Sequence, residues 1–280
     1  MAMTPLVSTD WLAERLDDPT VKVIDGSWVL VGTPGDANAD FVAGHIPGAV
    51  HFDIDQVADH STDLPHMLPS PQEFATAVRR MGIEAGDQIV VYDTGSVYSA
   101  ARVWWTFRAM GHRDVAVLDG GLPKWTAEGH PVETGWPDKP HGEFKAHLDE
   151  TLVRDAGQVQ AILSDGSAQV VDARPAARFR GEAPELRPGL RGGHMPGALN
   201  TPAGTLVRDG RLLPPDELRA AFDATGVDLG KPLVTTCGSG VTASLLALAM
   251  AVLGREDVAV YDGSWSEWGR LEGAPVVTGA

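Results

Sequence analysis

Short apolar runs alternate with longer segments of helical spacing along most of this chain. The runs are rich in Val, Ile and Tyr and predict strands at residues 21–25, 88–93, 115–119, 170–172, 232–237 and 260–262. Between them, residues 8–16, 70–81 and 99–110 carry capping residues and amphipathic or apolar spacing that predict helices. Because strands that alternate with helices form mostly parallel sheets with helices on both faces, the pattern predicts an α/β fold.

The most apolar segment starts at about residue 241 and runs to Leu253, before Gly254. It is hydrophobic on almost every face, so we expect a buried helix. It is shorter than the roughly 20 residues that a membrane-spanning helix needs, which places it in a protein core. The preceding strand ends at Cys237, and Gly238 and Gly240 follow in the connecting turn. Cys237 therefore lies where a strand turns into a helix.

The second half of the chain repeats the landmarks of the first half in the same order. The matched pairs are Asp25 with Asp172, His45 with His194, Asp93 with Cys237, and Asp119 with Asp262. Their separations stay between 143 residues (Asp119 to Asp262) and 149 residues (His45 to His194). Four landmarks in the same order, at separations that differ by at most six residues, predict a tandem duplication of one α/β domain, each copy with a five-stranded sheet.

The duplication predicts the domain boundaries. Residues 1–133 form the first domain and residues 150–280 the second, while residues 134–149, which begin with a Pro- and Gly-bearing stretch, form a linker. Asp93 occupies the place of Cys237 in the first copy. We therefore expect thiol chemistry in the second copy alone, with the first as a structural partner that closes one wall of a cleft.

Composition and charge exclude several classes of binding partner and a secreted location. The chain of 280 residues carries a formal net charge of −16, which argues against nucleic acid or an anionic membrane as a main partner. It has one cysteine, which argues against a secreted protein built on disulfides. No basic region followed by an apolar run opens the sequence, so we expect a cytoplasmic protein.

The position of Cys237 favours a reactive thiolate. The first turn of a helix presents unpaired N–H groups and a partial positive charge of about half a unit. Gly238 and Gly240 let the backbone curl around the sulfur, so we expect several N–H groups to stabilise the anion. The alternative is an inert cysteine in the core. As the only cysteine in the chain, Cys237 has no intramolecular disulfide partner.

Over nearly its whole length the chain resembles the two-domain rhodanese-like sulfurtransferases. The pattern Phe41-x-x-x-His45-Ile-Pro-Gly-Ala-x-x-Phe52 is similar to the amino-terminal signature of the family. The pattern Tyr261-Asp-Gly-Ser-Trp265-x-Glu-Trp268 is similar to its carboxy-terminal signature. The loop Cys237-Gly-Ser-Gly-Val-Thr242 resembles that of 3-mercaptopyruvate sulfurtransferases, whereas thiosulfate-preferring rhodaneses carry basic residues just after the cysteine.

The resemblance implies a ping-pong reaction without cofactor or metal. Sulfur from a small-molecule donor, 3-mercaptopyruvate or thiosulfate, passes to Cys237 as a persulfide and then to cyanide or to a thiol such as reduced thioredoxin. The same N–H groups that stabilise the thiolate would hold the terminal sulfur. The loop residues Gly238, Gly240, Val241 and Thr242 are expected to contact the donor.

The resemblance also implies roles for three side chains. Ser239 would polarise or protonate the mercaptopyruvate carbonyl as pyruvate enolate leaves, although serine at such a position also commonly caps a helix. Arg178 and Arg187 would bind the donor carboxylate, because an arginine fork fits a carboxylate with two hydrogen bonds. The alternative is a solvated basic patch in which the nearby arginines Arg174, Arg178, Arg180, Arg187 and Arg191 pair with Glu182 and Glu185.

His45 and Asp36 are further candidates for catalysis from the first domain. Both copies carry the same histidine turn, however, which favours a structural role for His45 and for His194. The polar residues His51, Asp53, Asp55, His60 and His66 match no standard metal-binding spacing, so we predict no metal site.

Other functions stay open. A thiosulfate:cyanide sulfurtransferase would use the same cysteine, and a non-catalytic regulatory module would keep the fold alone. A rhodanese-like phosphatase needs an arginine six residues after the cysteine, where this chain has Ala243.

Overall fold

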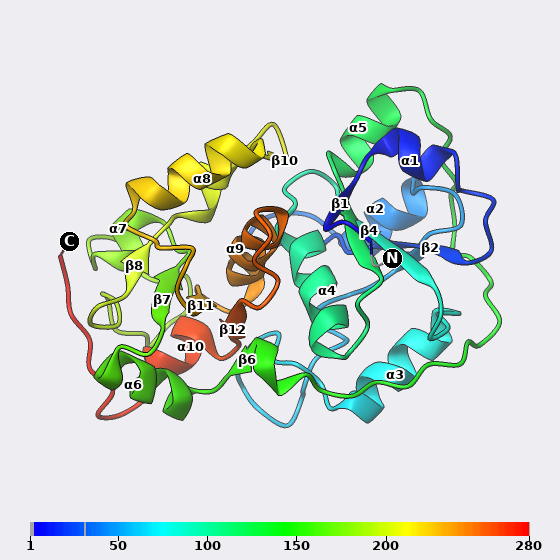
Figure 1. The fold of residues 1–280 in the computed structure, drawn as a ribbon. Helices are drawn as coiled ribbons and strands as arrows, with labels where there is room; N and C mark the ends of the chain where they lie inside the picture. The colour runs from blue at the N-terminus through cyan, green and yellow to red at the C-terminus, as the bar shows by residue number, and fades with distance from the viewer. Residues whose placement is uncertain (1–2, 31, 280) are drawn as a thin grey trace. The chain divides into compact units, whose positions relative to one another are not determined.

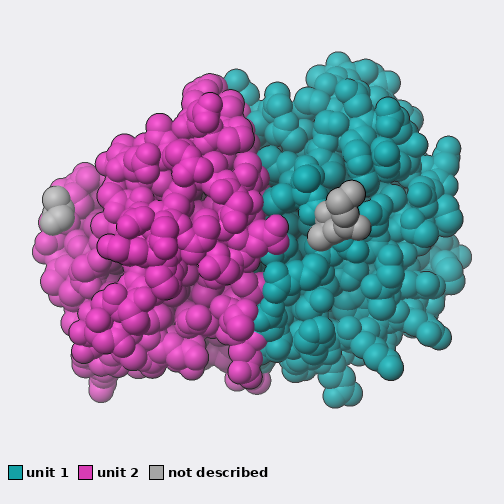
Figure 2. Space-filling view, in the orientation of Figure 1, with its two compact units in different colours: residues 1–59, 68–149, 209–211 teal, residues 60–67, 150–208, 212–280 magenta. Residues whose placement is uncertain are grey.

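The computed structural model describes residues 3–30 and 32–279, which divide into two compact units (Figures 1 and 2). Unit 1 consists of residues 1–59, 68–149 and 209–211, and unit 2 of residues 60–67, 150–208 and 212–280. The segment 134–149 is part of unit 1, where Phe144 is buried against Phe74 and Phe107. Residues 60–67 and 209–211 each belong to the unit built mainly from the other half of the chain.

Unit 1 contains a five-stranded sheet in the order β1-β5-β4-β2-β3. Its strands are β1 (Leu6–Val7), β2 (Val21–Asp25), β3 (Val50–His51), β4 (Gln88–Tyr92) and β5 (Val115–Leu118). Its helices are α1 (Thr9–Ala13), α2 (Ala37–Ala43), α3 (Pro71–Arg80), α4 (Tyr98–Ala109) and α5 (Gly121–Ala127). Each pair of neighbouring strands in this sheet is parallel.

Unit 2 repeats this topology with the order β6-β12-β11-β7-β8. Its strands are β6 (Val153–Arg154), β7 (Gln169–Asp172), β8 (Leu199–Asn200), β11 (Leu233–Thr236) and β12 (Ala259–Tyr261), all paired in parallel. Its α-helices are α6 (Ala156–Asp165), α7 (Ala176–Phe179), α8 (Pro215–Ala224), α9 (Val241–Val252) and α10 (Ser264–Trp268). The 3-10 turns η1 (Glu150–Leu152) and η2 (Ala203–Leu206) and a two-stranded sheet of β9 (Val207–Arg208) and β10 (Arg211–Leu212) complete the chain. The predicted duplicated α/β fold is confirmed.

Both faces of the first sheet are covered. On one face, alternate residues of the strands pack against Leu12 of α1, Phe41 of α2 and Trp125 of α5. On the other face, a Cβ added at Gly26 would meet Val91 of β4 and Val103 of α4. Helices therefore cover the sheet from two sides, as the alternation of strands and helices predicts.

Local sequence signals set the helix ends. Ser70 and Glu73 form a reciprocal capping box at the start of α3, and Gly82 follows its end with a φ of +75°. Helix α9 is buried from Ala243 to Ala251, and Gly254 follows it with a φ of +87°. The edge strands β1, β3, β6 and β8 were not predicted, because each has two residues and shows no periodicity.

No helix among the described residues is both long and apolar enough to cross a membrane.

The stability of unit 1 should fall in mild acid because of His112. Burial among Phe107 and Phe144 lowers the pKa of this imidazole below its ordinary value. A lowered pKa means that the unfolded chain binds a proton more readily, so stability is lost as the pH falls through about 6.5.

Urea unfolding at pH 7.5 and pH 5 measures this effect. The loss of unfolding free energy between the two pH values should be smaller in His112→Gln than in the wild type. Replacement of the exposed His141 by Gln serves as the control and should leave the wild-type loss unchanged. An equal loss in wild type and His112→Gln would contradict the assignment.

Candidate active site

Cys237 follows the last residue of β11, between that strand and α9. It is 1% exposed, and its Sγ accepts a hydrogen bond of 3.1 Å from the N–H of Gly240. Gly240 precedes α9 with a φ of +82°, a conformation that glycine adopts without strain. Among the described residues, one backbone N–H donates to the sulfur, where the sequence predicted several. The cysteine side chain is short, so its Sγ atom does not reach the other N–H groups of the loop.

The first turn of α10 clamps the cysteine loop. The N–H of Trp265 donates to the carbonyl of Cys237 at 2.9 Å, and the N–H of Ser266 donates to that of Gly238 at 2.9 Å. The hydroxyl of Ser264 accepts from the N–H of Cys237 and donates to the carbonyl of Tyr261. Each peptide group next to the sulfur is therefore held, so the loop is preorganised before a donor binds.

Ser239 does not cap the helix. Gly240 is the N-cap residue of α9 and provides no side-chain cap, and its own N–H donates to Sγ of Cys237. The capping alternative for Ser239 is wrong, because a cap needs a side-chain oxygen on the N2 or N3 N–H. Ser239 is 8% exposed two residues beyond the nucleophile, and Val241 and Thr242 form the first turn of α9.

The matching loop of the first copy holds a carboxylate. Oδ1 of Asp93 accepts from the N–H groups of Gly95, Ser96 and Val97 at 3.0 to 3.1 Å. Its Oδ2 accepts from the hydroxyl of Ser99 and the N–H of Ala100. This strand-to-helix loop therefore binds a fixed anion at the place where unit 2 carries its thiol.

A series of four charged side chains leads from β7 to the cysteine loop. Arg174 donates to Asp172 at 2.7 Å and to Glu185 at 2.8 Å, and all three side chains are buried. Oε2 of Glu185 lies 3.6 Å from Nη1 of Arg178. The same Nη1 is 4.0 Å from the position that a Cβ on Gly238 would take. The guanidinium of Arg178 therefore lies beside the loop, and its role as a carboxylate ligand stays a prediction.

Arg187 contacts a histidine from the first half of the chain. Its Nη2 lies 3.5 Å from Nε2 of His66, which belongs to unit 2 and is 5% exposed. Arg187 follows Glu185 by two residues, so both lie on the segment that carries the charge series.

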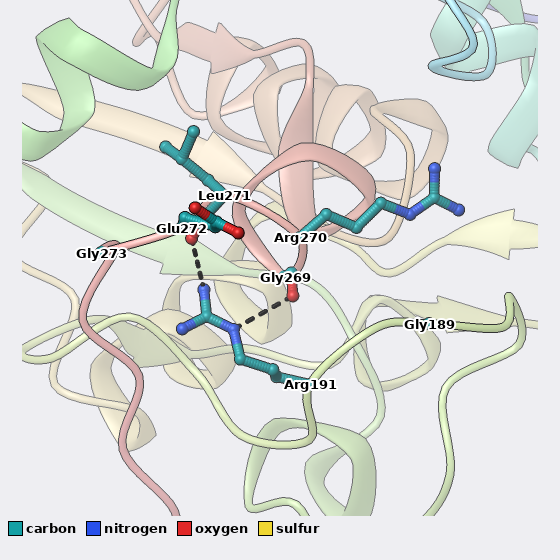
Figure 3. Close-up of a pocket in the computed structure, with 7 residues that line it drawn as sticks. All are labelled: Gly189, Arg191, Gly269, Arg270, Leu271, Glu272 and Gly273. Atoms are coloured by element: carbon teal, nitrogen blue, oxygen red, sulfur yellow. Dashed lines mark hydrogen bonds between the residues drawn. The ribbon is translucent and has the colours of Figure 1, made fainter.

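Arg180 and Arg191 have other partners. Arg180 forms an exposed ion pair with Glu182 at 2.7 Å. Arg191 donates to the carbonyls of Trp268, Gly269, Leu271 and Ala274 and so ties down the segment after α10. It lines a hollow of about 340 Å³ with Gly189 and residues 269–273, shown in Figure 3. This hollow does not include Cys237 or its loop.

His45 and His194 make the same contacts in the two copies. Nδ1 of His45 lies 2.8 Å from the carbonyl of Phe41, and the two rings stack at 4.1 Å. His194 repeats both contacts with Phe179, at 2.9 Å and 3.7 Å. The backbone of each histidine also forms an isolated antiparallel bridge, with Glu133 or with Val277. These contacts support the structural role considered for the two histidine turns.

Asp36 is exposed and accepts hydrogen bonds from the N–H groups of Asn38 and Ala39, so it caps α2. Asp36 and His45 both belong to unit 1, and their participation in catalysis stays a prediction.

Sequence reasoning missed three residues that contact Cys237 or the predicted ligands Arg178 and Arg187. Glu185 was considered only as a surface partner of the arginines, His66 only in the rejected metal set, and Ser264 only as part of the carboxy-terminal signature. The recurrence of Asp-Gly after a strand in both copies could have pointed to Ser264, because it follows that turn. Within the described residues, no group of three or more His, Cys, Asp or Glu side chains is arranged to hold a metal ion.

Comparison with known proteins gives consistent matches. The model of the rhodanese-like domain matches residues 8–128 and 155–271. A 3-mercaptopyruvate sulfurtransferase of Escherichia coli is 46% identical over 99% of both chains, and the human 3-mercaptopyruvate sulfurtransferase is 43% identical over 94% of this chain and 91% of its own. A thiosulfate sulfurtransferase of Gallus gallus is 46% identical over 94% of this chain and 92% of its own. The crystal structure of the E. coli 3-mercaptopyruvate enzyme matches with a TM-score of 0.87 and 44% identity, over 95% of this chain and all of its own.

The anion held by the first copy should be important for stability. Asp93→Asn removes the charge and leaves the N–H of Ala100 facing an amide, so we expect a loss of about 1.5–3 kcal/mol in unfolding free energy. Urea unfolding measures the change. Asp18→Asn, at an exposed aspartate that accepts two hydrogen bonds from Thr20, is the control and should leave stability nearly unchanged, because water replaces the lost interactions. Similar small losses in both variants would show that the buried carboxylate is not needed.

Proposed function

The chain belongs to the rhodanese family, with two rhodanese-like domains, and from this premise we propose that it is a 3-mercaptopyruvate sulfurtransferase. Cys237 is the nucleophile, Ser239 polarises or protonates the mercaptopyruvate carbonyl as pyruvate enolate leaves, and Arg178 and Arg187 bind the donor carboxylate. The observation that carries this proposal is the guanidinium of Arg178 beside the clamped loop of Cys237.

The reaction has two halves. In the first, the Cys237 thiolate attacks the sulfur of 3-mercaptopyruvate, so an S–S bond forms and the C–S bond breaks. The electron pair of that bond leaves with pyruvate as its enolate, which takes up the proton released by the sulfur and becomes pyruvate. In the second half, an acceptor thiolate attacks the outer sulfur of the persulfide and regenerates the Cys237 thiolate.

The loop supplies what each step needs. The N–H of Gly240 already donates to the sulfur at 3.1 Å and stabilises the thiolate and the persulfide anion. The hydroxyl of Ser239 is not engaged as a helix cap, so it is available to the donor carbonyl. Gly238, Val241 and Thr242 complete the loop around the donor.

Thiosulfate is the competing donor. The similarity to the thiosulfate sulfurtransferase of Gallus gallus favours thiosulfate sulfurtransferase activity as the second candidate function. The two residues after the nucleophile are Gly238 and Ser239, and neither carries a charge. A neutral loop attracts a doubly charged donor less strongly than a basic one, while an arginine fork suits the carboxylate of mercaptopyruvate. We therefore infer that mercaptopyruvate is the preferred donor.

We infer that the sulfur acceptor is a thiol, such as that of reduced thioredoxin, or cyanide. The single cysteine of this acidic chain suits a reducing compartment, so we infer a cytoplasmic location. The first domain, with Asp93 in place of cysteine, serves as a structural partner.

Mass spectrometry of the intact protein tests the first half of the reaction. Incubation with 3-mercaptopyruvate should add the mass of one sulfur atom, and dithiothreitol should remove it. Cys237→Ser should show no addition, because the chain has no other cysteine. Addition of sulfur to Cys237→Ser, or none to the wild type, would reject the proposal.

A charge-preserving substitution tests the carboxylate ligand. Arg178→Lys keeps the positive charge but loses the planar fork, so KM for 3-mercaptopyruvate should rise about tenfold, which corresponds to about 1.4 kcal/mol. KM for thiosulfate should change less than threefold. Arg180→Lys, at the exposed pair with Glu182, is the matched control and should alter neither constant. An equal rise for both donors in Arg178→Lys would discard the role.

A further inference from the structure

The arginine beside the cysteine loop comes with a buried carboxylate attached. Oε2 of Glu185 lies 3.6 Å from Nη1 of Arg178, and the Glu185 side chain is 4% exposed while that of Arg178 is 20% exposed. The guanidinium therefore has one end toward a buried negative charge and lies beside Gly238. An anionic donor bound to Arg178 would be attracted by the guanidinium and repelled by the carboxylate of Glu185.

Glu185 is held in place from behind. Its Oε1 accepts from Nη1 of Arg174 at 2.8 Å. Arg174 in turn is fixed by Asp172, by the carbonyl of Gly193 at 2.9 Å and by the ring of Trp265, whose centroid lies 4.0 Å from its guanidinium carbon. The carboxylate of Glu185 therefore does not move away when an anion approaches Arg178.

Burial makes this negative charge effective. Charges interact more strongly where water is excluded, because the effective dielectric constant falls. Burial raises the pKa of Glu185 above its ordinary value, although the charges of Arg174 and Arg178 oppose the rise. The ionised carboxylate of Glu185 is thus weakly solvated, and it opposes any further negative charge at the site.

We propose that Glu185 determines donor specificity by offsetting the charge of Arg178, so that the site accepts a singly charged carboxylate and disfavours a doubly charged donor. This inference rests on the proposed function, since it explains how one loop distinguishes mercaptopyruvate from thiosulfate. The fork of Arg178 still pairs with a carboxylate through its planar N–H groups. A dianion brings a second charge, which meets the carboxylate of Glu185.

A purely structural role for Glu185 predicts a different outcome. If it only held Arg174 and Arg178 in position, its loss would weaken both donors alike. The charge hypothesis instead predicts that the two donors change relative to each other, and that the ratio follows the charge at position 185 rather than the shape of the side chain.

The test compares kcat/KM for thiosulfate and for 3-mercaptopyruvate in the full chain. In Glu185→Gln, which keeps an acceptor for Arg174, the ratio of thiosulfate to mercaptopyruvate should rise about tenfold. Glu185→Asp restores the charge and should stay within about twofold of the wild-type ratio. Glu182→Gln, on the same segment but exposed and paired with Arg180, is the control and should leave the ratio unchanged.

Two outcomes would overturn the inference. One is an unchanged or lower ratio in Glu185→Gln, and the other is an equal change of the ratio in Glu185→Gln and Glu185→Asp. Circular dichroism verifies the fold of each variant, and Glu185→Ala takes the place of Glu185→Gln if the latter does not fold.

A binding experiment separates this inference from the proposed function. Isothermal titration with pyruvate, a monoanion, and with sulfate, a dianion, needs no turnover. Glu185→Gln should raise the affinity for sulfate relative to pyruvate about tenfold. If the wild type takes no sulfur from mercaptopyruvate but the variant shows this shift, the proposed function fails and the charge role stands. If sulfur transfer occurs without the shift, the charge role fails.

Discussion

The hydrogen bonds between the first turn of α10 and the loop after β11 are the constraint on which this site depends. The N–H groups of Trp265 and Ser266 donate to the carbonyls of Cys237 and Gly238, respectively. The hydroxyl of Ser264 accepts from the N–H of Cys237. These bonds orient the peptide groups that surround the sulfur. A nucleophile on such a loop needs no rearrangement before it reacts, because its donors are already in place.

The two copies show that one backbone arrangement serves two purposes. In unit 1, the N–H of Leu122 in α5 donates to the carbonyl of Asp93, just as Trp265 of α10 does to that of Cys237. Gly121 and Ser264 precede these donors with φ values of +54° and +49°. The shared geometry holds a carboxylate in one copy and the thiol sulfur of Cys237 in the other.

Charge is distributed to suit an anionic substrate on an acidic protein. The chain has a formal net charge of −16, yet a guanidinium lies beside the cysteine loop. The buried alternation of Asp172, Arg174 and Glu185 supports that guanidinium without excess positive charge. A buried ion pair is stable only when its partners are satisfied, and Arg174 achieves this with a carbonyl and an aromatic ring as well.

The sequence by itself determined the duplicated α/β fold, the long elements and the place of Cys237, because periodicity, capping residues and the glycines around the cysteine are local signals. Ser70, Gly82 and Gly254 set helix ends through contacts within a few residues. Only the tertiary structure decided which charged and polar side chains come into contact. Glu185 lies between Arg174 and Arg178, and His66 contacts Arg187, which is 121 residues away in the sequence. It also placed Ser264 under the cysteine loop. Contacts of this kind depend on how strands and turns that are distant in the chain pack together. The spacing of residues along the sequence does not determine the spatial distance between their side chains.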